Sequence, residues 1–326
     1  MEKRNSLYTN IAEELNLGEL KSQEIIQNLW SNYGELVRLR FHNKSIIVKH
    51  IKLPKNSAHP KGWNTKLSHQ RKLHSYEVEV NWYEKFSKNI DARCPIPKGL
   101  MTYKSENEYL IVMEDLASSG FDCIVKEASE NHIKSSLRWL ANFHARYMNT
   151  HNPSLWKTGT YWHLDTRPDE LEALEDKELK KYAFELDSIL KNAKYQTLVH
   201  GDAKLANFCF NNSGTLASAV DFQYVGQGCA MKDVILFISS AIKPEDLENM
   251  QDWCLDTYFK ELDEALKYYQ CDINSAEVES EYRELFCIAW ADFQRFLKGW
   301  SPNHFKINTY TENLTKRAFV YMKSNR

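Results

Sequence analysis

The chain has 326 residues, of which 43% are hydrophobic and 26% charged, with a formal net charge of −2. This length allows one large core or two packed lobes, and the composition is that of an ordinary soluble globular protein. No apolar run approaches the roughly 20 residues of a membrane helix, and the net charge provides no basic field for nucleic acid. We therefore expect neither a membrane nor a nucleic-acid partner.

The N-terminus and the cysteines indicate the cellular compartment and the state of the thiols. The first ten residues precede no apolar segment and no small-residue cleavage site, which predicts no secretory signal and a cytoplasmic protein. The seven cysteines are scattered and form no C-x-x-C pair, which predicts reduced thiols rather than a disulfide or zinc framework.

The first third of the chain has mainly strand patterns. In chain order we expect one or two helices in 7–30, paired strands at 35–41 and 45–53, a helix at 75–86, and strands at 98–103 and 108–113. Residues 54–74 are polar and strongly basic, which favours a solvated loop, with a phosphate-facing lid as the alternative.

The composition changes at the small-residue stretch 114–120, which we take as a lobe boundary. This predicts an α+β protein with an N-lobe at residues 1–115 and a C-lobe at residues 116–326. Helices are expected near 127–149 and 169–192, with three or four more after Pro244.

The residues with chemical potential lie between Val199 and Asp233, in VHGDAKLANFCFNNSGTLASAVDFQYVGQGCAMKD. Two strand-like pieces, 197–199 and 216–220, are each followed by a polar group that contains an aspartate, Asp202 or Asp221, and the chain between them is short enough for a hairpin. Phosphoryl transfer needs carboxylate and amide oxygens for Mg²⁺ and one carboxylate to deprotonate the acceptor. Such groups are present at suitable spacing.

HGDAKLAN followed by VDFQ resembles the aminoglycoside phosphotransferase and choline kinase superfamily, closest to its ecdysteroid-kinase-like and choline-kinase-like branch. The resemblance extends from about Trp30 to Phe237. It implies a bilobal, protein-kinase-like fold with a small β-sheet N-lobe and a larger, mainly helical C-lobe. It also implies ATP and Mg²⁺ as cofactors, and a hydroxyl of a small metabolite, amino alcohol or antibiotic as acceptor.

The same resemblance assigns roles in the second half of the chain. Asp202 corresponds to the catalytic base, and Asn207 and Asp221 to the magnesium ligands. His200 would support the catalytic loop, and Lys204 would neutralise the transferring phosphate.

The N-lobe supplies the expected nucleotide-binding residues. Lys49 interrupts the apolar strand around Ile46–Ile51 and resembles the lysine that binds the α- and β-phosphates. Its partner should be Glu79, with Glu77 as the alternative. Lys52, near the end of the same strand, is expected to be solvated.

Two further segments belong to the expected ATP site. The backbone around Glu114 and Leu116 would form a hinge that meets the adenine edge. No G-x-G-x-x-G precedes Lys49, so the turn over the phosphates would be Ser31-Asn32-Tyr33-Gly34, with Gly34 as its single glycine. Gln223 replaces the glycine of the D-F-G motif of protein kinases, which argues against an on/off switch at this motif.

Three buried-looking polar residues have open interpretations. For Asp233 we favour a brace of the catalytic loop over direct catalysis, and for His144 a hydrogen-bonded core histidine over an active one. Asp292 lies in the segment 290–300, a candidate wall of the acceptor pocket. It could hold a cationic acceptor, or it could form a plain i, i+3 pair with Arg295 on a solvated helix face.

These patterns favour an ATP-dependent small-molecule kinase. The alternative is a catalytically weak or inactive ATP-binding module, against which stand Lys49, Asp202, Asn207 and Asp221, all intact. A protein kinase is disfavoured, because only twelve positions separate Asp221 from Asp233 and leave no room for a long activation segment. No obligate protein partner is evident, and the identity of the acceptor is not encoded in any motif.

Overall fold

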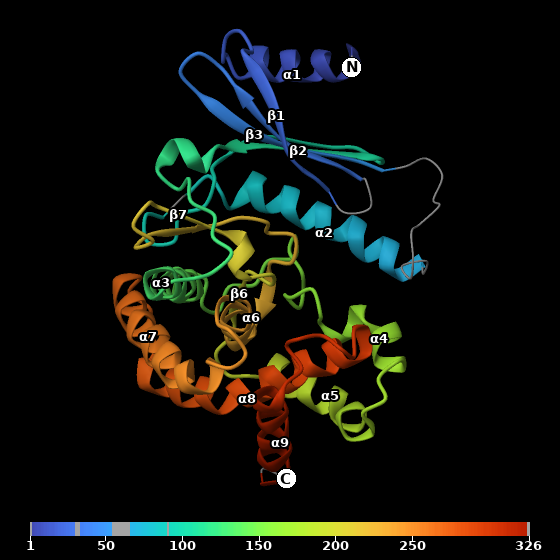
Figure 1. Ribbon diagram of the computed structural model, residues 1–326, viewed down its shortest axis with the longest axis vertical. Coiled ribbons are helices and arrows are strands. Elements are labelled where there is room, and N and C mark those ends of the chain that lie inside the picture. Colours follow the sequence, from blue (N-terminus) through green and yellow to red (C-terminus); the bar gives the residue numbers. More distant parts are fainter. Residues whose placement is uncertain (1, 30–32, 54–65, 90, 325–326) are drawn as a thin grey trace.

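A computed structural model describes residues 2–29, 33–53, 66–89 and 91–324 of the chain. A sheet-bearing N-terminal part lies above a larger helical part (Figure 1). The helices are α1 (Glu2–Glu14), α2 (Lys66–Lys85), α3 (Glu130–Arg146), α4 (Pro168–Glu172), α5 (Lys177–Lys191), α6 (Met231–Ala241), α7 (Leu247–Tyr268), α8 (Ser275–Trp300) and α9 (Thr309–Ser324). The strands are β1 (Ser22–Asn28), β2 (Gly34–Arg40), β3 (Ser45–Lys52), β4 (Gly99–Lys104), β5 (Glu108–Glu114), β6 (Thr197–Val199), β7 (Phe208–Phe210), β8 (Ala217–Ala219) and β9 (Gly226–Gly228).

The N-terminal part is a five-stranded antiparallel sheet in the order β1-β2-β3-β5-β4. It confirms the four strands predicted between residues 35 and 113. In the centre of the sheet Lys49 of β3 lies between Leu36 of β2 and Ile111 of β5. The last strand ends at Glu114, one residue before the predicted lobe boundary, which itself stays a prediction.

The sheet lies between α1 and α2. Because side chains alternate along β3, one set of its residues packs toward α1 and the other toward α2. Ile46 and Val48 belong to a small core with Tyr8 of α1. Ile47 and Ile51 belong to the main core, which includes the buried face of α2. Because Lys49 has the same parity as these two residues, the period of two directs its side chain to the α2 side of the sheet.

The helical part is built around α8, whose residues 285–297 are all buried. Helices α5, α6 and α9 pack on it, and α3 packs along α7. Two short two-stranded sheets, β6 with β9 and β7 with β8, lie between these helices and the upper sheet. None of the helices in the described ranges is both long and apolar enough to span a bilayer.

The helical prediction for residues 7–30 is only half right, because residues 22–28 form the strand β1. Every residue of β1 is exposed. An edge strand without a buried face has no apolar alternation to reveal it, and its pairing with β2 is a tertiary fact.

The basic segment 54–74 is also corrected. Residues 66–74 are the first half of α2 and not a solvated loop, and they include Arg71, which is buried. Residues 54–65 lie outside the described residues, so the lid alternative is not addressed there.

Two further details differ from prediction. The stretch 169–192 is two helices, α4 and α5, with a break at 173–176. The strands that precede the two aspartates do not pair with each other, because β6 pairs with β9 and β8 pairs with β7. The hairpin between the two aspartates is instead formed by β7 and β8.

Candidate active site

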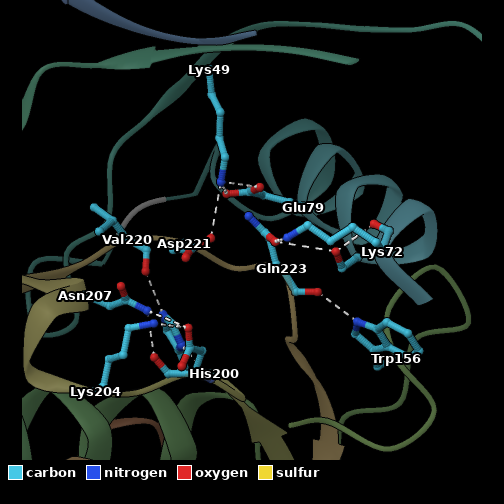
Figure 2. A network of polar contacts seen from close by, with 12 residues as sticks. Lys49, Lys72, Glu79, Trp156, His200, Lys204, Asn207, Val220, Asp221 and Gln223 are labelled. Carbon is cyan, nitrogen blue, oxygen red and sulfur yellow. Dashed lines mark hydrogen bonds and ion pairs between the residues drawn. The ribbon is translucent and has the colours of Figure 1, made fainter. Parts of the chain in front are cut away.

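Lys49 and Glu79 form a buried ion pair where the sheet meets α2. The Lys49 ammonium lies 2.8 and 2.7 Å from the two carboxylate oxygens of Glu79, and 3.2 Å from Oδ1 of Asp221 (Figure 2). Glu77, the alternative partner, is paired with Lys104 instead. Lys52 is exposed, as expected.

Burial and charge act against each other in this group. Burial opposes the charge of Lys49, but Asp221 and Glu79 outweigh it and raise the pKa of the lysine. Burial raises the pKa of Glu79 to about 6, with Lys49 opposing the rise. At neutral pH Lys49, Glu79 and Asp221 are therefore ionised. The ion pair with Glu79 holds the Lys49 ammonium beside the Asp221 carboxylate.

Asp221 has an unusual backbone. Its φ is 70°, in the left-handed region, which costs a non-glycine residue about 1–3 kcal/mol. Burial would raise its pKa, but the charges of Lys49, Lys204 and Lys72 together lower it to about 2. A strained, charged carboxylate between the five-stranded sheet and the helical part is the kind of feature that marks a functional position.

The segment 202–207 brings three predicted residues together. Lys204 donates to Oδ2 of Asp202 at 2.7 Å. The side-chain amide of Asn207 donates to the main-chain oxygen of Asp202 at 2.8 Å and to its carboxylate at 3.1 Å. Burial raises the pKa of Asp202, with Lys204 opposing the rise and Asp221 adding to it. The Asp202 carboxylate is therefore more basic than a solvated aspartate.

His200 fixes the backbone at this segment and is completely buried. Its Nδ1 accepts from the main-chain N–H of Asp202 at 3.2 Å, so its Nε2 is the protonated nitrogen that donates to the carbonyl of Val220 at 3.0 Å. Burial lowers the pKa of His200, which keeps the ring neutral in this arrangement. The ring thus links the segments of Asp202 and Asp221.

Asp233, at the start of α6, braces the same loop from below, as favoured from the sequence. Its carboxylate accepts from the main-chain N–H groups of His200 at 2.5 Å and Gly201 at 2.9 Å. Its Oδ2 also accepts from Nε2 of His144 at 3.2 Å, and Nδ1 of His144 lies 2.9 Å from the hydroxyl of Tyr258. The side chains of Asp233, His144 and Tyr258 are all buried, so His144 is a core histidine.

We expect Asp233→Ala to lower the free energy of unfolding by about 3–5 kcal/mol, because it leaves several buried donors without an acceptor. Asp246→Ala is a matched control, since Asp246 is exposed at the start of α7 and makes no side-chain cap there. Denaturant unfolding of both variants measures the difference. Equal stability of the two variants would show that Asp233 does not brace the loop.

The remaining predicted nucleotide residues lie at or just beyond the ends of strands: Gly34 begins β2, Glu114 ends β5 and Leu116 follows it. Glu114 donates its main-chain N–H to Lys98, and the carbonyl of Leu116 accepts from Phe121, so this segment is tied into the fold at the end of β5. Gly34 starts β2 with φ 151°, and a Cβ there would lie 1.9 Å from the carbonyl oxygen of His50. A glycine is therefore required by the close approach of β3. Contacts of these residues with ATP stay a prediction, and Ser31 and Asn32 lie outside the described residues.

The predicted i, i+3 pair of Asp292 with Arg295 is present, but it lies in the core and not on a solvated helix face, and the pocket-wall interpretation is wrong. The Asp292 side chain is fully buried inside α8, where it accepts from Arg295 at 2.9 and 3.0 Å and from the indole of Trp162 at 3.1 Å. Lys232 lies 3.9 Å away. The carboxylate is neutralised inside the core, so it is neither a wall of an acceptor pocket nor part of a solvated face.

Two lysines near Asp221 and Asp202 were not identified from the sequence. Lys72 on α2 donates to Gln223 at 3.1 Å. Lys306, in the loop between α8 and α9, donates to Ser239 at 2.9 Å and lies close enough to Asp202 for that charge to act on it. Burial lowers the pKa of each ammonium to about 8. The basic segment 54–74 was a signal for Lys72, but nothing in the sequence relates Lys306 to residues a hundred positions earlier.

The residues around Asp221 have suitable chemistry for a magnesium ion. Asp221 contributes a charged carboxylate, and the amide of Asn207 turns its nitrogen toward Asp202 and so leaves its oxygen on the opposite side (Figure 2). Hard oxygen donors of this kind are what Mg²⁺ takes from proteins, and its further ligands come from water and phosphate. Within the described ranges no cluster of three or more histidine, cysteine or carboxylate side chains is arranged to hold a metal.

The arrangement of sheet and helices is a kinase-like fold. A protein of Ralstonia eutropha provisionally named an aminoglycoside phosphotransferase has a similar structure, with a TM-score of 0.55, 12% identity and coverage of 98% of both chains. A microcompartment-associated aminopropanol kinase matches over 97% of this chain and 98% of its own, with a TM-score of 0.49 and 12% identity. At such identities the likeness concerns the fold alone.

The chain belongs to the ecdysteroid kinase-like family, whose model matches residues 38–161 and 158–271. An uncharacterized kinase-like protein of Caenorhabditis elegans is 23% identical over 235 residues, a match that spans 64% of this chain and 61% of that protein. Family membership agrees with the resemblance seen in HGDAKLAN and VDFQ.

Proposed function

We propose that this protein is an ATP-dependent small-molecule kinase that transfers the γ-phosphoryl group to a hydroxyl of its acceptor. One observation carries the proposal: the Lys49–Glu79 pair of the N-terminal part meets Asp221 at 3.2 Å, beside the segment that holds Asp202. Three residues that are distant in the sequence thus form one polar network, and phosphoryl transfer requires such a combination of cations and carboxylates.

In this proposal each side chain has one task. Asp202 accepts the proton of the attacking hydroxyl, which its raised pKa favours. Lys49 holds the α- and β-phosphates, and Lys204 neutralises charge on the transferred group. Asp221 and Asn207 would hold Mg²⁺, which supplies positive charge along the phosphates when bound. The adenine would lie against the backbone of Glu114 and Leu116.

The acceptor class is tested by a screen of ADP release. Purified protein with MgATP is offered hydroxylated metabolites, amino alcohols, sugars, hydroxylated steroids and aminoglycoside antibiotics, and products are identified by mass spectrometry. We expect at least one acceptor to give ADP and phosphorylated product in equal amounts, with product formation by Asp202→Ala lowered at least about 100-fold. ATP binding without turnover on any acceptor would instead favour an inactive ATP-binding module.

A further inference from the structure

Lys72 lies in the network but differs from its other two lysines. Its ammonium enters from α2 and donates to Oε1 of Gln223 at 3.1 Å (Figure 2). It also lies 4.7 Å from the centre of the Tyr76 ring. Both contacts are with uncharged groups. Within the part of the chain that the structure describes, no carboxylate forms an ion pair with Lys72.

The other two ammonium groups of the network are already neutralised. Lys49 has both oxygens of Glu79, and Lys204 has Asp202. Lys72 instead interacts electrostatically with Asp221, Lys49, Glu79 and Asp202, but it forms no hydrogen bond or ion pair with any of them. A partly buried ammonium with only neutral partners is costly in the absence of an anion and gains most when one binds.

Gln223 has a clear task in this arrangement. Its main-chain carbonyl oxygen accepts a hydrogen bond from the indole of Trp156 at 2.8 Å. Its side-chain oxygen Oε1 also accepts from the hydroxyl of Ser75 at 3.4 Å. The glutamine is thereby held with Oε1 toward Lys72. A glycine at this place, as in D-F-G, could not orient the lysine.

We propose that Lys72 binds the terminal phosphate of ATP, with Gln223 as the residue that positions its ammonium. The inference rests on the proposed kinase function. Lys49 is assigned to the α- and β-phosphates, while Lys72 enters from α2 and contacts Gln223, two positions after the expected magnesium ligand Asp221, a position suited to the terminal phosphate.

In the transfer the bond from the γ-phosphorus to the bridging oxygen breaks, and a bond to the acceptor oxygen forms. The acceptor proton passes to Asp202, and ADP leaves with the bridging oxygen. Lys72 keeps its proton and donates hydrogen bonds to a non-bridging oxygen throughout. It thus supplies charge that a single-glycine turn before β2 would not.

The test compares nucleotides that differ in the terminal phosphate. Calorimetry measures the affinity of ADP and of an ATP analogue with nitrogen in the β,γ-bridge, both with Mg²⁺, for wild type and for Lys72→Met. We expect the variant to bind the ATP analogue at least about tenfold more weakly and ADP within about twofold of wild type. Lys52→Met, an exposed lysine of β3, is the matched control and should change neither affinity.

The outcomes separate this inference from the proposed function. Suppose that wild type binds the ATP analogue. If Lys72→Met then lowers the affinities for ADP and for the ATP analogue equally, or changes neither affinity, Lys72 is not a ligand of the terminal phosphate. If wild type binds neither nucleotide, the kinase proposal fails and this inference fails with it. A melting temperature of Lys72→Met equal to or above that of wild type is expected, because a desolvated charge is removed, and a clear drop would indicate a structural role instead.

Discussion

Asp202→Asn should lower kcat by roughly 10²- to 10⁴-fold, the usual contribution of a positioned general base, while affinity for MgATP stays near the wild-type value. The carboxylate is the group that can accept the proton of the acceptor hydroxyl, and the amide cannot. Steady-state kinetics with an acceptor found in the screen, together with calorimetry of nucleotide binding, measures both quantities. Turnover close to wild type would exclude Asp202 as the base.

The stability of the same variant provides a control. Because burial raises the pKa of Asp202 above its unfolded value, its ionised form costs folding free energy at neutral pH. Asp202→Asn should therefore melt at the wild-type temperature or above it. A loss of activity together with retained stability would assign the effect to chemistry and not to the fold.

Asp221→Asn should abolish the Mg²⁺ dependence of ATP binding and weaken binding by more than about 100-fold. Loss of residues that merely orient a metal ligand costs about 10–100-fold in affinity, so loss of a ligand should cost more. Asparagine is the preferred substitution because it tolerates the left-handed backbone at φ 70°, whereas alanine would add strain. Titration of ATP with and without Mg²⁺ is the measurement, and unchanged affinity and unchanged Mg²⁺ dependence would contradict the assignment.

The sign of the stability effect is opposite at the two aspartates. Lys49, Lys204 and Lys72 outweigh burial and lower the pKa of Asp221 to about 2, so its ionised form stabilises the fold above the ordinary aspartate pKa. That contribution is lost as the pH falls toward 2. At neutral pH Asp221→Asn should therefore lower the melting temperature, in contrast to Asp202→Asn.

The polar segment 202–207 could be recognised in the sequence because its residues are close together in the chain. Asp202, Lys204 and Asn207 lie within six positions, so local geometry suffices to bring them into contact. That Lys49 pairs with a glutamate of the following helix was also predictable, since the period of two along β3 fixes the face on which the lysine lies. The choice of Glu79 over Glu77 depends on how α2 is rotated against the sheet, and only the packed structure settles it.

By itself the sequence determined the kinase-like fold, the strands between residues 34 and 114 and, apart from Lys72, the charged residues of the polar network, because period, turn and motif are local properties. Tertiary structure alone decided the strand nature of β1, the burial of Asp292 and the position of Lys72 beside Gln223. Each of these depends on a neighbour far away in the chain: the free edge of β2, the indole of Trp162, and the turn after Asp221. Burial and ion pairing depend on contacts between residues that are far apart in the chain. A carboxylate in an apolar helix therefore looks the same in the sequence whether it faces a pocket or an arginine.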